Sequence, residues 1–84
     1  MLNLEYGLKI WCCEPEELRS VLHNCWKAGI HYDSGAHALT YSLYAPIGLY
    51  IQNGTLRMEW DKDKFNALNL DRASAKEFVN ESEN

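Results

Sequence analysis

An Asn53-Gly54 dipeptide between two alternating segments constrains the fold of this chain more than any other feature. Both residues tolerate the positive φ angles of a two-residue hairpin turn, so the segments that flank them are expected to pair as antiparallel strands. Apolar side chains occupy every second position in most of residues 47–52 and residues 55–60. The return strand is expected to present on one face Leu56, Met58 and Trp60.

Three other segments also have the pattern of strands. Residues 4–12 alternate with a period of two, and one face of this segment carries Leu4, Tyr6, Leu8, Ile10 and Cys12. Residues 38–44 alternate in the same way until Ala45-Pro46, where proline interrupts the ladder because it donates no hydrogen bond. Residues 30–33 suit a short strand. The chain therefore predicts a sheet with a strongly apolar face.

Residues 15–28 have the clearest helical pattern. Pro15 suits the first position of a helix because its missing N–H would be unpaired there anyway. Gly29 suits a left-handed cap at the other end. One face of this helix carries the apolar stripe Leu18, Val21, Leu22, Cys25 and Trp26.

The last quarter of the chain has a weaker pattern. Residues 61–64 alternate acidic and basic side chains, as a solvated segment does. Ser74 and Glu77 have the spacing of a capping box, which predicts a final helix that begins near Asp71 or Ser74. Residues 80–84 are expected to fray at the end of that helix.

These segments give the order β-α-β-β-β-α, in which several strands follow one another without helices between them. Such an order predicts an α+β fold with a small, mainly antiparallel sheet of about four strands and a C-terminal helix. A chain of 84 residues has room for a single core, so we expect one domain over residues 1–84. Helix 15–28 is expected to cover the sheet face formed by Leu8, Ile10, Leu39, Leu43, Leu49, Ile51, Leu56 and Met58.

The charge balance limits the classes of partner. Twelve acidic residues against eight basic ones give a formal charge of −4, which argues against direct binding of nucleic acid. No apolar run approaches the roughly 18–20 residues needed to cross a bilayer, and the first residues lack the pattern of a secretory signal. The three cysteines form a poor disulfide framework, because two are adjacent: Cys12, Cys13 and Cys25. We therefore expect a cytoplasmic protein without membrane contact.

Candidate catalytic and metal-binding residues lack the required spacing. The histidines and cysteines show no C-x-x-C or H-x₃-H pattern, and His23 and Cys25 diverge on a helix. No Gly-rich phosphate loop and no G-x-S-x-G sequence occurs. Mimicry of DNA needs a denser field of carboxylates than the acidic residues from Glu59 onward provide, because basic residues dilute them. We expect neither enzymatic activity nor a cofactor or metal.

The sheet face that points away from helix 15–28 is the more informative surface. It is expected to carry aromatic and polar side chains, namely Trp11, Tyr44, Tyr50, Lys9, Arg57 and Gln52. Gly7 and Gly48 leave space among them. Two interpretations stay open: the last helix or a second subunit covers this patch, or part of the patch binds a partner or ligand. Tyr32 and His37 form a second candidate contact site in a loop.

Several segments together resemble small accessory proteins of tailed bacteriophages. They are Cys13–Glu17 with a helix that ends in Trp26–Ile30, then Tyr32–Gly35, the hairpin Tyr50–Leu56, Phe65, and a terminal Lys76–Val79. Similar proteins with known roles include non-enzymatic inhibitors of host defences, such as anti-CRISPR proteins and sponges that sequester cyclic-nucleotide signals. The resemblance implies a role of this kind and carries over no site residues.

The leading hypothesis is a non-enzymatic protein that occludes a host protein stoichiometrically in the host cytoplasm, as a homo-oligomer. Trp11, Tyr44, Tyr50 and Arg57 are the expected contact residues, with Lys9 beside them. One alternative is that the same face sequesters a nucleotide or cyclic-nucleotide signal, with Lys9 or Arg57 on a phosphate. The other alternative is a structural or regulatory accessory module.

Overall fold

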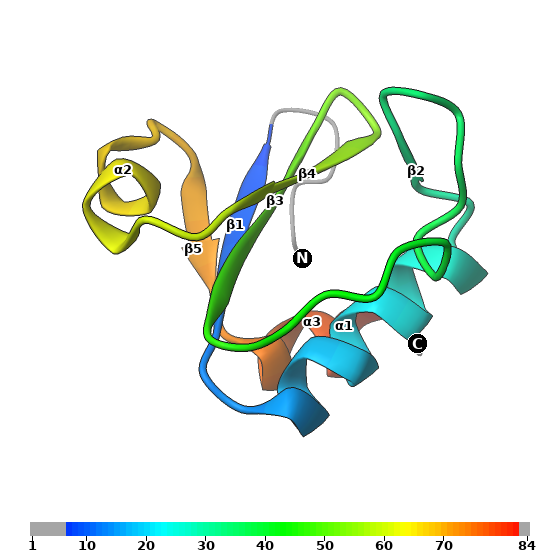
Figure 1. Cartoon of the computed structure of the whole chain (residues 1–84), viewed down its shortest axis with the longest axis horizontal. Coiled ribbons are helices and arrows are strands. Elements are labelled where there is room, and N and C mark those ends of the chain that lie inside the picture. Colours follow the sequence, from blue (N-terminus) through cyan, green and yellow to red (C-terminus); the bar gives the residue numbers. More distant parts are fainter. Residues whose placement is uncertain (1–6, 83–84) are drawn as a thin grey trace.

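The computed structural model describes residues 7–82, with side chains through residue 80, and forms a small α+β fold (Figure 1). Residues 4–6 of the first predicted strand, and the last two residues of the predicted frayed tail, lie outside the described residues. The described elements are β1 (Leu8–Cys12), α1 (Pro15–Lys27), β2 (His31–Tyr32), β3 (Ile47–Gln52), β4 (Thr55–Glu59), α2 (Lys62–Ala67), β5 (Asp71–Ala73) and α3 (Ala75–Ser82).

The predicted hairpin is present as β3 and β4. Asn53 and Gly54 join the strands with φ angles of 54° and 75°, as a two-residue turn of this kind requires. The antiparallel register pairs Gln52 with Thr55 beside the turn and continues to the pair of Gly48 and Glu59.

The sheet is mixed, whereas the sequence predicts a mainly antiparallel sheet of about four strands. Five strands lie in the order β2-β4-β3-β1-β5. β3 is antiparallel to both β1 and β4, but β5 runs parallel to β1 and β2 runs parallel to β4. The two parallel strands have three and two residues, so neither is long enough to show an alternating pattern in the sequence.

Helix α1 has the predicted position and the predicted ends. At its start, the backbone N–H of Glu14 donates to Oε1 of Glu17 at 3.1 Å, which completes the capping contact before Pro15. At its end, Gly29 has a φ of 76°, and the N–H of Ile30 donates to the carbonyl oxygen of Cys25 at 2.9 Å. The chain thereby leaves the helix in a fixed direction and enters β2.

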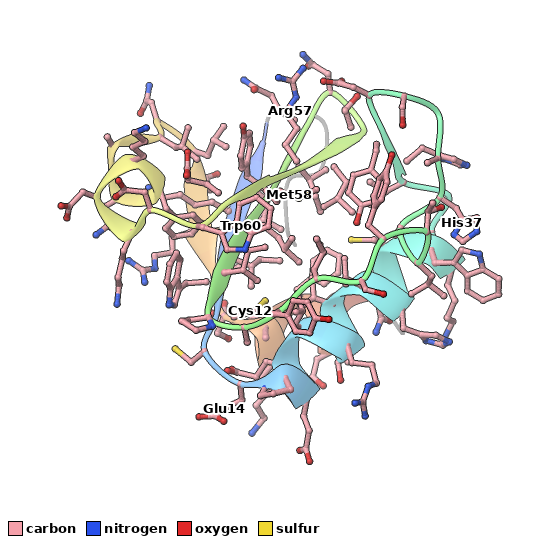
Figure 2. The ribbon with its side chains drawn as sticks, viewed as in Figure 1. Cys12, Glu14, His37, Arg57, Met58 and Trp60 are labelled. Atoms are coloured by element: carbon pink, nitrogen blue, oxygen red, sulfur yellow. The ribbon has the colours of Figure 1, made fainter. Side chains whose placement is uncertain are left out.

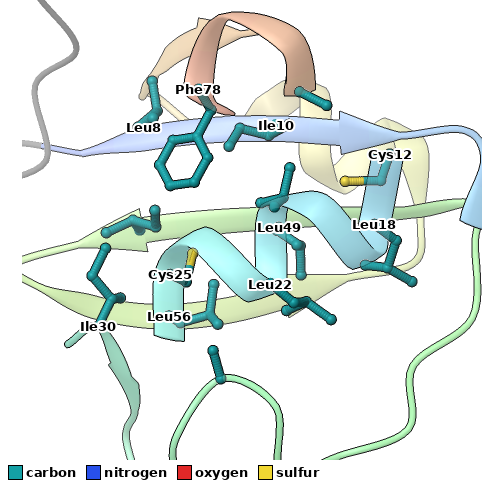
Figure 3. Close-up of a cluster of buried hydrophobic side chains, with 14 of the residues drawn as sticks. Leu8, Ile10, Cys12, Leu18, Leu22, Cys25, Ile30, Leu49, Leu56 and Phe78 are labelled. Carbon is teal, nitrogen blue, oxygen red and sulfur yellow. The ribbon is translucent and has the colours of Figure 1, made fainter. Parts of the chain in front are cut away.

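One face of the sheet packs against α1 and α3, and the main core fills the space between them (Figure 3). Of the predicted face, Leu39 is exposed, whereas Leu43 and Met58 are half-buried at the margin of the core. Trp26, the last residue of the predicted stripe on α1, is exposed as well. The core side chains that are buried as predicted are Leu8, Ile10, Cys12, Leu18, Val21, Leu22, Cys25, Leu49, Ile51 and Leu56.

The strand predicted over residues 38–44 is wrong, because this segment is a loop. One isolated antiparallel bridge joins His31 to His37, and the N–H of Thr40 then donates to the carbonyl oxygen of His37 in a turn. The loop connects β2 to β3 and contains a cis peptide bond between Ala45 and Pro46. Alternation alone does not make a strand where no neighbouring strand is available to pair with it.

Residues 61–64, predicted to be a solvated segment, begin a short helix instead. Oδ1 of Asp61 accepts hydrogen bonds from the N–H groups of Asp63 and Lys64 at 2.9 and 3.3 Å, which caps α2. Phe65 is the apolar anchor of this helix and is fully buried. α2 therefore packs on the sheet, on the face opposite α1 and α3.

The predicted capping box of the last helix is confirmed. The N–H of Ser74 donates to Oε1 of Glu77 at 3.1 Å, and the N–H of Glu77 donates to Oγ of Ser74 at 3.0 Å. Residues 71–73 form β5 and the helix follows from Ala75. α3 extends to Ser82, and the fraying expected over residues 80–84 stays a prediction.

Candidate functional site

The sequence predicted Lys9 to be an accessible contact residue, but its side chain lies inside the fold and stabilises it. Its side chain is only 7% exposed. The Nζ atom donates hydrogen bonds to the carbonyl oxygens of Phe65, Asn66 and Leu68 at 3.2, 3.0 and 2.8 Å. These carbonyls end the short helix α2, where a cation also complements the helix dipole. Lys9 therefore holds α2 to the sheet.

Trp11 is also covered by side chains of α2. Its ring lies 5.3 Å from the ring of Phe65, centroid to centroid, and the Nζ atom of Lys62 lies 5.4 Å from the Trp11 centroid. The space that Gly48 was expected to leave open is filled, since a Cβ atom there would lie 2.3 Å from Cδ2 of Phe65. The predicted patch is thus partly covered, and the cover is α2 rather than the C-terminal helix.

Tyr44 lies apart from the other predicted contact residues. It belongs to the loop after β2 and is 77% exposed. It lines a shallow groove of about 450 Å³ between that loop and α1, on the side of the molecule that carries Leu18 and Leu22. The error follows from the wrong strand over residues 38–44, whose assumed phase put Tyr44 beside Tyr50.

Tyr50 and Arg57 do lie together, as predicted, and they line a hollow beside β4. They are register partners on β3 and β4. The hollow has a volume of about 780 Å³ and lies along the outer edge of β4; we call it the edge hollow. Three of its lining side chains, Arg57, Met58 and Trp60, are labelled in Figure 2. Its lining consists of Tyr32, Asp33, Ser34, Tyr41, Ser42, Leu43, Tyr50, Leu56, Arg57, Met58 and Trp60.

The edge hollow exists because β2 covers only the first part of β4. β2 pairs with β4 at Thr55 and Leu56, and the chain then turns away at Asp33. Within residues 7–82, no strand pairs with the outer edge of β4 beyond Leu56. The loop after β2 returns at a distance as the opposite wall, with Tyr41 and Leu43.

Aromatic side chains dominate the rim and walls of the edge hollow. Trp60, directly after β4, is 54% exposed, and Tyr41 is 46% exposed. The rings of Tyr32 and Tyr41 meet edge to face at 5.0 Å between centroids. The hydroxyl of Tyr32 donates to the carbonyl oxygen of Ala38 at 3.0 Å, and burial raises the pKa of Tyr32 to about 12. Tyr32 is therefore a buried, uncharged part of the wall, whereas the sequence suggested a contact residue in a loop.

Arg57 carries the positive charge of the edge hollow, and Asp33 neutralises it. Nη2 of Arg57 lies 2.8 Å from Oδ2 of Asp33. The two side chains are 50% and 61% exposed, so this ion pair contributes at most about 1 kcal/mol to stability. The pair orients the guanidinium group at the mouth of the hollow.

Two of the three cysteines have no features of a reactive thiol. Burial raises the pKa values of Cys12 and Cys25 to about 12, so both are neutral thiols near pH 7. They pack in the main core as small apolar side chains, and Cys13 is exposed. Among the described side chains, no group of three or more His, Cys, Asp or Glu residues is arranged to hold a metal ion.

Sequence reasoning missed Trp60, Met58 and Tyr41 as site residues. Alternation assigned Met58 and Trp60 to the core face of the return strand. It gives no information on how far along the strand that face is covered by other elements. The charged residues 61–64 after Trp60 were the available signal, because they predict that the chain returns to solvent at that point.

Comparison with known proteins identifies no relative of this chain. No family model matches the sequence, and neither a curated protein nor a solved structure gives a significant match. In the part of the chain that the structure describes, no helix has the length and apolar character to span a membrane. The edge hollow is therefore the feature of this chain that bears on its function.

Proposed function

We propose that this protein is a non-enzymatic binding protein that occludes a partner protein stoichiometrically, with the edge hollow as its docking surface. The observation that carries the proposal is the pair of exposed rings, Trp60 and Tyr41, beside an aromatic-lined hollow of about 780 Å³. Tryptophan, tyrosine and arginine are the side chains that most often dominate protein interfaces, especially where they fill or line pockets. Arg57 supplies the third of these side chains at the mouth of the hollow.

The resemblance to small phage accessory proteins supports a host protein, such as a component of a defence system, as the partner. A protein of this kind acts by covering a surface that its target needs, so it requires a rigid docking face and no catalytic group. The rigid walls of the edge hollow, formed by two paired strands and the fixed ring of Tyr32, suit this role.

The geometry favours a protein partner over a nucleotide. A phosphate in the edge hollow would meet Arg57 with the carboxylate of Asp33 only 2.8 Å from the guanidinium. The second cation that the sequence offered for a phosphate, Lys9, donates to three backbone carbonyls beneath α2. Repulsion from the carboxylate of Asp33 therefore weakens the binding of an anion at this site more than it weakens the binding of an uncharged protein surface.

Alanine at both Tyr50 and Trp60 is expected to weaken partner binding by at least about 30-fold, because each ring has the position of an interface anchor. Trp26→Ala is the matched control, since Trp26 is an exposed tryptophan on α1, away from the edge hollow. The measurement is affinity capture from host lysate, followed by calorimetric titration of the captured partner with the wild type and each variant.

Saturation at a fixed stoichiometry, lost in the double variant and kept in Trp26→Ala, is the expected result. Equal affinity of the double variant and the control would contradict the proposed surface. Turnover of a substrate by substoichiometric protein would contradict a binding function, and release of an intact nucleotide on heating would favour sequestration instead.

A further inference from the structure

The hairpin fixes which backbone groups of β4 point outward. In a two-residue hairpin loop, the residues that flank the loop form a hydrogen-bonded pair, here Gln52 and Thr55. Hydrogen-bonded and non-hydrogen-bonded pairs then alternate along an antiparallel ladder. Arg57 and Glu59 accordingly direct their N–H and C=O groups toward β3, whereas Leu56 and Met58 direct theirs toward the outer edge.

Only one of these two outward-facing residues is covered. Leu56 pairs with Tyr32 of β2, and the described chain provides no strand opposite Met58. The open edge has charges on one face, from Arg57 and Glu59, and an apolar side chain on the other, from Met58. An open edge of this kind is a template for pairing with another strand.

We propose that a second copy of this chain occupies the open edge, and that the two β4 strands pair antiparallel about a twofold axis at Met58. In this register Met58 faces Met58 of the partner subunit, and each Met58 exchanges N–H···O=C bonds with the other. Arg57 then lies opposite Glu59 of the partner subunit, and the symmetry repeats this contact. The charge pattern of β4 is thus complementary to itself.

Neighbouring registers lack this complementarity. A shift of the axis to Glu59 places two glutamates directly opposite one another, which is destabilising. A shift to Arg57 places two arginines opposite one another and also requires the backbone groups of Leu56, which β2 already uses. Of these three registers, the one centred on Met58 pairs opposite charges and uses backbone groups that no described strand occupies.

The side chains at this edge have groups left for such contacts. Nη2 of Arg57 is paired with Asp33, and its guanidinium group has further N–H donors. Oε2 of Glu59 accepts from the N–H of Asp61 at 3.1 Å, which leaves Oε1 for a new donor. The exposed ring of Trp60 lies one residue beyond the paired segment and would be shielded by the second copy.

Self-pairing and the proposed partner use the same edge, so they exclude each other. The dimer would cover the unpaired outer edge of β4 until a partner competes for it. The dimer requires no partner protein, so the two proposals can fail separately. Absence of the dimer would leave the proposed function intact, and failure of the proposed function would leave the dimer intact.

Sedimentation velocity of the purified full chain over a range of concentrations tests the dimer. The wild type is expected to show a monomer–dimer equilibrium. Arg57→Glu and Glu59→Arg should each weaken association by about 30-fold, because each replaces two attractive contacts by two repulsive ones. The double variant Arg57→Glu with Glu59→Arg should restore association, and Lys27→Glu, an exposed charge change on α1, should have no effect.

A charge reversal at Arg57 also disturbs its ion pair with Asp33. A backbone variant tests the dimer without changing that pair. Methylation of the Met58 amide nitrogen, introduced by peptide ligation, deletes the outward donor and leaves the ladder between β3 and β4 intact. The methylated chain is expected to be monomeric with a native circular dichroism spectrum. A wild type that stays monomeric at its highest soluble concentration, a failure of the double reversal to restore association, or a dimer that survives methylation would each overturn the proposal.

Discussion

Phe65→Ala is expected to lower the free energy of unfolding by about 4 kcal/mol, although Phe65 lies outside the main core. Phe65 is fully buried and is the one apolar anchor of α2. Its ring contacts Trp11 and lies so close to Gly48 that no side chain fits there. Truncation would leave a cavity that a six-residue helix cannot close by itself.

Urea denaturation, followed by far-ultraviolet circular dichroism, measures this loss. Trp26→Ala serves as the control, because it truncates an exposed ring and should change stability by no more than about 0.5 kcal/mol. A loss below about 1 kcal/mol in Phe65→Ala would mean that α2 does not cover the sheet as described.

Lys9→Met is expected to lower the free energy of unfolding by about 3 kcal/mol. Methionine keeps the apolar part of the side chain but removes the charged donor, so the carbonyl oxygens of Phe65, Asn66 and Leu68 lose their shared partner. The measurement is the same urea titration, with Lys27→Met as the control for loss of an exposed lysine on α1.

The Lys9 result also separates two roles for this residue. A structural lysine predicts lost stability in Lys9→Met, with partner binding retained in the molecules that remain folded. Unchanged stability together with lost binding would instead support the role that the sequence suggested, a lysine on the contact surface.

The elements that depend on local signals were predictable from the sequence. The turn at Asn53-Gly54 and the caps of α1 and α3 need only residues within one or two turns of each other. The alternation of β1 and β3 then specified which of their side chains enter the core. These signals made the α+β class predictable.

The elements that depend on distant partners were not predictable. Residues 38–44 alternate as well as β3 does. The edge that they would need is partly taken by β2, and the rest has no strand beside it in residues 7–82. Phe65 follows a run of four charged residues, and its burial depends on a glycine at position 48, seventeen positions earlier in the chain. Single-sequence periodicity contains no information on such contacts.

The same distinction explains the outcome for the site. Tyr50 and Arg57 were found because the hairpin register places them side by side. Lys9 and Trp11 were misassigned because α2, hidden in the charged segment, lies over them. Trp60 was missed because the length of β2, only two residues, decides where the edge of β4 opens.

Amide hydrogen exchange at Met58 measures whether the outer edge of β4 is open. In dilute solution, the N–H of Arg57 should exchange slowly because it is directed to β3, and the N–H of Met58 should exchange at nearly the rate of an unstructured amide. Raising the protein concentration should slow exchange at Met58. A Met58 amide that is as protected as Arg57 in dilute solution would contradict the open edge, and a Met58 amide that stays unprotected at every concentration would contradict the dimer.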